Sequence, residues 1–112
     1  MVNFEYKAAQ RLASDIRTTH QAIDEALSDL ASLACSVIEA SRTSDAPPSQ
    51  TQAAIESVAI GLTKLVDARK GFVAAHREIA VAHRNSNLQE INFGCFGDKP
   101  VLPSADLRVV NG

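Results

Sequence analysis

Hydrophobic residues recur every seven positions in the second half of the chain. Val58, Leu65, Phe72 and Ile79 follow this spacing, and seven residues make nearly two turns of an α-helix. These four side chains therefore line one stripe of a helix, which we expect over residues 50–86. A narrow apolar stripe of this kind packs against a second helix.

The first half of the chain predicts that second helix, over residues 4–42. Asn3 is a good N-cap residue, and Glu5 falls in the first turn, where the helix dipole favours an acid. Apolar residues alternate there by three and four positions, which is typical of a heptad seam. The predicted seam consists of Ala9, Leu12, Ile16, Thr19, Ile23, Ala26, Leu30, Leu33, Val37 and Ala40.

A short connector at residues 43–50 separates the two predicted helices. It contains an aspartate and two consecutive prolines, which end a helix because the residue before a proline avoids helical geometry. Ser49 and Gln52 have the spacing of a capping box and predict the start of the second helix. Since so short a connector joins antiparallel neighbours, we expect an all-α, long antiparallel helical hairpin over residues 1–86.

The second half of the first helix is apolar over more than half of its circumference. A helix with one partner needs an apolar face of roughly 100°, so the excess requires a further cover. We therefore expect two hairpins to pair into a homodimeric four-helix bundle. The alternatives are a monomer covered by its own tail and a higher oligomer. The predicted dimer face consists of Leu27, Ala31, Ala34 and Ile38, with Cys35 beside them.

Residues 87–112 lose the helical period, and glycines and prolines punctuate them. The segment is nevertheless too apolar for a solvated, disordered tail. We expect a short helical turn near residues 88–92, followed by an irregular, extended strip packed on the bundle or on a partner subunit. Cys95 lies in this segment, and its redox role stays open. The two cysteines lack CxxC spacing and predict neither a zinc site nor a disulfide scaffold.

Composition and charge exclude several classes of function. Aromatic residues make up only 4% of the chain and Trp is absent, which argues against a surface that stacks nucleic-acid bases. The net charge of -2 also makes nucleic-acid binding an unfavoured role. No apolar run approaches the roughly 18 to 20 residues that span a bilayer. The first residues lack a signal-peptide pattern, so we expect a cytoplasmic protein without a membrane span.

Three histidines raise the question of a metal site. If the hairpin folds near Pro47 and both helices rise equally, His20 lies near His76, with Asp24 one turn from His20. Such residues can hold a metal ion in a bundle core, and they define an alternative function, a small-ligand or metal-binding bundle. The Glu-x-x-His signature of di-iron bundles is absent, and we expect no cofactor. The competing interpretation is that His76 and His83 flank the seam with a ring edge towards solvent.

A basic stripe is formed by Lys70, Arg77 and Arg84, which also repeat every seven residues. It can bind an acidic partner, or it can be a solvated face near a helix C-terminus, where the dipole favours cations. No nucleophile motif, phosphate-binding glycine loop or pair of catalytic carboxylates appears. The sequence therefore favours a non-enzymatic interaction or scaffold protein that self-associates.

The connector reads Asp-Ala-Pro-Pro-Ser at residues 45–49. In length and layout the chain resembles the small helical hairpins exported by type VII secretion, which carry a Trp-x-Gly motif in their turn. Because that motif is missing here, the resemblance is one of architecture, and it implies a two-helix hairpin. Phasin-like coiled helical proteins share the composition equally loosely.

Overall fold

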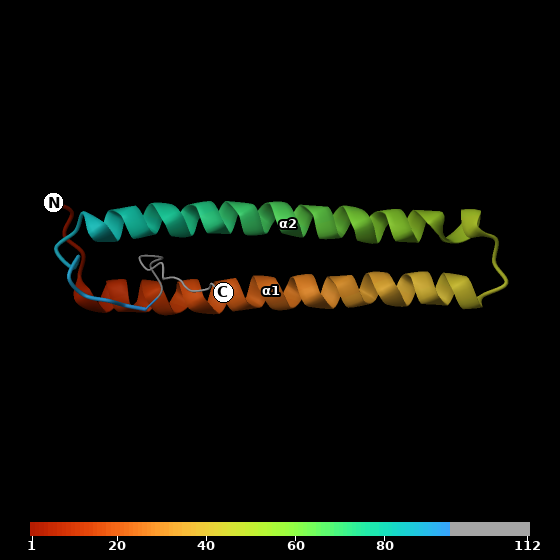
Figure 1. The fold of residues 1–112 in the computed structure, drawn as a ribbon, viewed down its shortest axis with the longest axis horizontal. Helices are drawn as coiled ribbons and strands as arrows, with labels where there is room; N and C mark the ends of the chain where they lie inside the picture. The colour runs from red at the N-terminus through yellow and green to blue at the C-terminus, as the bar shows by residue number, and fades with distance from the viewer. Residues whose placement is uncertain (95–112) are drawn as a thin grey trace, which may run out of the picture. The chain divides into compact units, whose positions relative to one another are not determined.

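The computed structural model describes residues 1–94, which form two helices, α1 (Tyr6–Thr43) and α2 (Pro48–Arg84). The chain divides into two compact units, and within each a segment of α1 lies side by side with an oppositely directed segment of α2 (Figure 1). The predicted all-α helical hairpin is therefore confirmed. In the described part of the chain, no helix is long and apolar enough to cross a membrane.

Helix α1 begins two residues later than predicted, because the residues before it pair with the chain that follows α2. The Val2 N–H donates to the Asn85 carbonyl over 3.3 Å, and the Asn87 N–H donates to the Val2 carbonyl over 2.9 Å. The side chain of Asn87 extends this pairing to Phe4, accepting from its N–H over 2.7 Å and donating to its carbonyl over 3.1 Å. Glu5 precedes the first helical residue instead of lying in the first turn.

Helix α2 begins at Pro48, two residues earlier than predicted. Proline suits the first helical position because its fixed φ matches the helix and the missing N–H would have no partner there. Ser49 therefore lies inside the helix, and the predicted capping box does not form. Instead, Gln52 Nε2 donates to Glu56 Oε2 over 3.0 Å.

Unit 2 (Thr19–Phe72) contains the connector and the helix segments beside it. Of the predicted α1 seam in this unit, one column is half-buried, whereas its second column, including Ala26 and Leu33, is exposed. The column that contains Leu27 and Ala34 replaces it. The prediction missed that the Leu27–Ala34 column also carries His20 and Ser41, which contact Phe72 and Thr51 on α2. The half-buried seam of α1 in unit 2 consists of His20, Ile23, Leu27, Leu30, Ala34, Val37 and Ser41.

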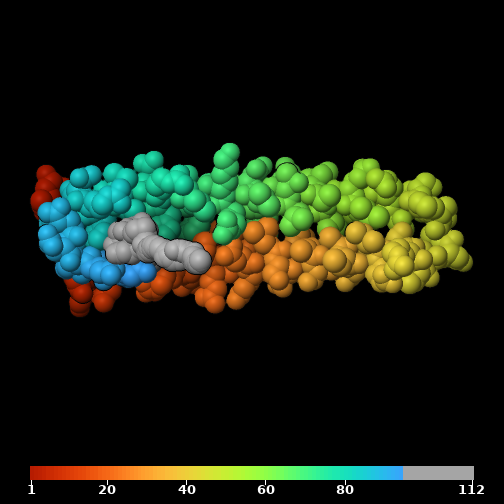
Figure 2. All heavy atoms as spheres, viewed as in Figure 1, coloured from red at the N-terminus to blue at the C-terminus, as the bar shows by residue number. Residues whose placement is uncertain are grey.

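No side chain of unit 2 is fully buried. Side chains of α1 and α2 meet along this unit (Figure 2), but each seam residue keeps contact with solvent. Several large apolar side chains are also exposed, among them Leu33 (50%), Ile38 (45%), Ile60 (55%) and Val66 (51%). The physical reason is that two helices alone bury only the strip along which they touch.

Unit 1, of which residues 1–18 and 73–94 are described, holds the buried residues of the described chain. The chain after α2 contributes to this core through turns, in which Gln89 N–H donates to the Ser86 carbonyl and Ile91 N–H to the Leu88 carbonyl. These turns stand where a short helical turn was predicted. Among the described residues of unit 1, the buried set is Ala9, Ala13, Ile16, Ala80, His83, Ser86 and Leu88.

Phe93 attaches the end of the described chain to unit 1. Its ring lies 5.6 Å from the His83 ring and 5.7 Å from the Tyr6 ring between centroids, and Arg17 Nη1 donates to its carbonyl over 2.9 Å. The rest of the predicted tail, including Cys95, lies outside the described residues. Docking of the whole tail therefore stays a prediction.

Candidate functional site

An apolar groove opens on one side of unit 2, and we call it the Leu33 groove. It has a volume of about 380 Å³ and is shallow, so that its walls are accessible from solvent. Helix α1 provides most of the walls, and α2 provides one leucine. The lining residues are Ala26, Asp29, Leu30, Leu33 and Leu65.

Small residues border the Leu33 groove on α2. A Cβ placed on Gly61 would lie 3.8 Å from Leu30 Cδ2, so Gly61 is a neighbour of a groove residue. Ala54 and Ala68 lie seven positions before and after Gly61 and therefore share its side of the helix. One wall residue of the groove, Leu30, therefore adjoins a strip of α2 that has almost no side-chain bulk.

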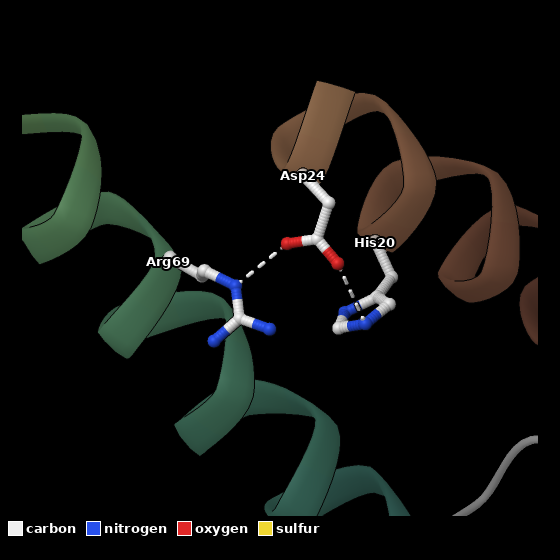
Figure 3. Close-up of polar contacts among 3 residues, drawn as sticks. All are labelled: His20, Asp24 and Arg69. Carbon is white, nitrogen blue, oxygen red and sulfur yellow. Dashed lines mark hydrogen bonds and ion pairs between the residues drawn. The ribbon is translucent and has the colours of Figure 1, made fainter. Parts of the chain in front are cut away.

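A polar cluster joins the helices elsewhere in unit 2. Figure 3 shows Asp24 of α1 between His20 of the same helix and Arg69, which reaches across from α2. Arg69 Nε donates to Asp24 Oδ1 over 2.7 Å, and His20 Nε2 lies 3.3 Å from Asp24 Oδ2. The His20 ring stacks on Phe72, with 5.9 Å between centroids. The cluster therefore links the helices at a defined register.

The hydrogen bond from Arg69 lowers the pKa of Asp24 against a desolvation effect, and the positive charge of Arg69 acts in the same direction, as does His20 in its protonated form. Asp24 is therefore ionised at neutral pH. Its side chain is 44% exposed, so solvent screens the ion pair. This carboxylate is suited to holding a cationic side chain, and its low pKa makes it a poor general base at neutral pH.

Of the three predicted metal ligands, His20 and Asp24 lie 3.3 Å apart in unit 2, and His76 belongs to unit 1. Among residues 1–94, no group of three or more His, Cys, Asp and Glu side chains could hold a metal ion. His20 has Phe72 as its neighbour on α2, about one turn before the expected His76, and the charge of Arg69 opposes a cation at Asp24. No hydroxyl or thiol of the described chain hydrogen-bonds His20, so the cluster also lacks the nucleophile that an Asp–His pair would activate.

The other two histidines lie in unit 1. His76 is half-buried, in agreement with a position beside the seam. His83 is only 6% exposed, and its Nε2 lies 2.9 Å from the Leu88 carbonyl oxygen. The expectation that the His83 ring has an edge in solvent was wrong, because the chain after α2 covers it.

The predicted dimer face does not form a single free surface. Leu27 and Ala34 are half-buried in the seam, whereas Ala31 and Ile38 are exposed. Cys35 is also exposed. In unit 2, a groove between the helices exposes apolar surface around Leu33, a residue that the sequence assigned to the contact between the helices.

Two residues of the predicted basic stripe line a groove in unit 1. This groove has a volume of about 350 Å³ and is lined by Val73, His76, Arg77, Ala80 and Arg84. Lys70 is exposed and belongs to unit 2. The stripe is therefore represented at this groove by Arg77 and Arg84 alone.

Comparisons with known proteins give no family assignment. No protein-family model, no curated protein and no solved structure matches the chain. The function is therefore argued from the two grooves and the polar cluster.

Proposed function

We propose that this chain is a non-enzymatic scaffold protein that forms a homodimer. In the dimer, the hairpins of two copies pack together through the Leu33 groove and form a four-helix bundle. The observation that supports the proposal is that unit 2 has no fully buried side chain, although apolar residues follow both of its helices. Helices in proteins gain most of their stability from packing an apolar face. A second copy provides the missing layer at the geometry that four-helix bundles use.

The shape of the groove favours a second copy as the occupant. In a two-fold interface the same patch serves both subunits, so it must be complementary to itself. The Leu33 groove can meet this condition because exposed Leu33 lines it together with Leu30, and Leu30 in turn contacts the position of Gly61 on α2, where there is no side chain. Leu33 of each copy then fills the space above the partner's α2, in the manner of knobs entering holes.

Sedimentation equilibrium of the full chain from about 1 to 100 µM tests the proposal, because specific homodimers of ordinary interface size bind in or below this range. We expect twice the monomer mass for the wild type and the monomer mass for Leu33→Arg, since a buried unpaired charge is costly.

Ile60→Arg is the matched control. Ile60 is as exposed as Leu33, but it lines a separate groove composed of α2 residues alone. It lies five positions before Leu65, about 140° around the helix. The control variant should remain dimeric, and circular dichroism should show unchanged helix content in both variants. A wild type that is monomeric at every concentration contradicts the proposal.

A further inference from the structure

The groove in unit 1 combines an apolar floor with a basic rim. Ala80 is 4% exposed and Val73 is half-buried, so both present carbon surface at the floor. Arg77 and Arg84 are exposed and line the same groove. Among the described residues that line it, none is acidic. We call this surface the Arg77–Arg84 groove.

In the described part of the chain, the two guanidinium groups are open to an external ligand. Within residues 1–94, neither Arg77 nor Arg84 forms an ion pair or a side-chain hydrogen bond. They also do not cap the end of α2, although cations are common at that position. Other donors serve its last carbonyls: Asn85 Nδ2 donates to Val81 over 3.1 Å, and Ser86 Oγ donates to His83 over 2.8 Å.

We propose that the Arg77–Arg84 groove binds an acidic peptide segment of a partner protein. The planar guanidinium group presents paired N–H donors that match a carboxylate. Seven helical residues separate the two arginines, which is about 10 Å along the axis. Carboxylates seven positions apart on a helix have the same spacing. An apolar side chain between them is level with Ala80, and one a turn beyond is level with Val73.

Nucleic acid fits this surface less well than an acidic peptide. Affinity for phosphate backbones grows with the number of cations that contact them, and the groove offers two arginines on a chain of net charge -2. The floor of Val73 and Ala80 has a use in peptide binding, whereas it offers nothing to a phosphate. The inference does not depend on dimer formation, because the groove lies within one unit of one chain.

Fluorescence anisotropy with the full chain and labelled synthetic peptides tests the inference. The probe is a helical peptide of about 15 residues with Glu at two positions seven apart and leucine between them, a spacing of about 10 Å. A second peptide carries Gln in place of both Glu residues. We expect the Glu peptide to bind about tenfold more tightly than the Gln peptide, as two partly screened ion pairs allow. Raising the salt should reduce this difference.

Charge reversal locates the binding surface. Arg77→Glu combined with Arg84→Glu should weaken Glu-peptide binding at least about tenfold and allow a peptide with Lys at the same two positions to bind. Arg11→Glu combined with Lys64→Glu is the control, because it changes the net charge equally at exposed residues outside the groove. This control should bind the Glu peptide like the wild type.

A milder pair, Arg77→Gln with Arg84→Gln, keeps the test valid if charge reversal impairs folding, and it should also lose the preference for the Glu peptide. Equal affinity for the Glu and Gln peptides overturns the inference. So does an equal loss in the control variant. Binding of an oligonucleotide of matched charge as tightly as the Glu peptide overturns it as well.

Discussion

Leu33→Ala gives a quantitative test of pairing through the groove. Leu33 is 50% exposed in the single chain, so roughly half of its apolar surface is available to an interface. Full burial of a leucine side chain contributes about 1.5–3 kcal/mol, and the remaining half therefore contributes about 1 kcal/mol. A two-fold dimer contains this residue twice, so truncation should cost about 2 kcal/mol, which raises the Kd about 30-fold.

Analytical ultracentrifugation over a concentration series measures the Kd of each variant. Ile60→Ala removes a side chain of similar exposed fraction from a different side of α2 and should change the Kd by no more than about twofold. Ile38→Ala tests the dimer face expected from the sequence and should also have little effect. An unchanged Kd for Leu33→Ala, or a larger change for Ile38→Ala or Ile60→Ala, refutes pairing through the Leu33 groove.

Three further experiments test the interior of the hairpin. The lowered pKa of Asp24 stabilises the folded chain above the unfolded pKa of about 3.9, and this stabilisation is lost as the pH falls through the folded pKa. Urea unfolding should therefore show that acid reduces the free energy of unfolding more for the wild type than for Asp24→Asn. Equal reductions contradict the ion pair. A Cβ on Gly71 has open space, so thermal unfolding should show Gly71→Ala to be more stable by up to about 1 kcal/mol. Gly61→Ala fits the single chain equally well, and a smaller gain or a loss there reports a second copy over the groove, whereas equal gains count against that copy. Adding zinc should leave the melting temperature unchanged, because Arg69 occupies the carboxylate beside His20; a rise that His20→Ala abolishes would restore the metal hypothesis.

The sequence predicted the hairpin because its helices carry long apolar periods and a proline-rich connector. It also predicted the stripe on α2 at Val58 and Leu65, which are half-buried in the seam. It failed in choosing between two columns of α1, because it placed the column of Leu33 in the seam and the column of Leu27 outside it. Both choices are compatible with the apolar pattern.

Polar pairs between the helices accompany the observed seam, in which Leu27 is half-buried and Leu33 is exposed. Asp24 pairs with Arg69, and Ser41 Oγ and Thr51 Oγ1 share a hydrogen bond of 2.7 Å. Residues of these types are usually exposed, so a count of apolar positions does not reveal them as contacts across a seam. Ser41 belongs to the half-buried seam of α1 and Asp24 lies beside it, and Leu33 is left on the surface.

The closure of unit 1 also had no signal in the sequence. The backbone pairing of Val2 with Asn85 and Asn87 joins residues more than eighty positions apart. A single asparagine side chain and a few backbone groups form this contact, and neither produces a periodic pattern. The same holds for Arg17, whose partner is a backbone carbonyl, that of Phe93.

Isotope-filtered nuclear Overhauser spectroscopy on a mixture of labelled and unlabelled chains tests the central claim most directly, because it detects contacts between copies at named methyl groups. The account predicts intermolecular contacts at the methyl groups of Leu33 and Leu65, which line the groove, and none at Ile60. Intermolecular contacts at Ile60 without any at Leu33, or a complete absence of contacts between copies, would contradict it.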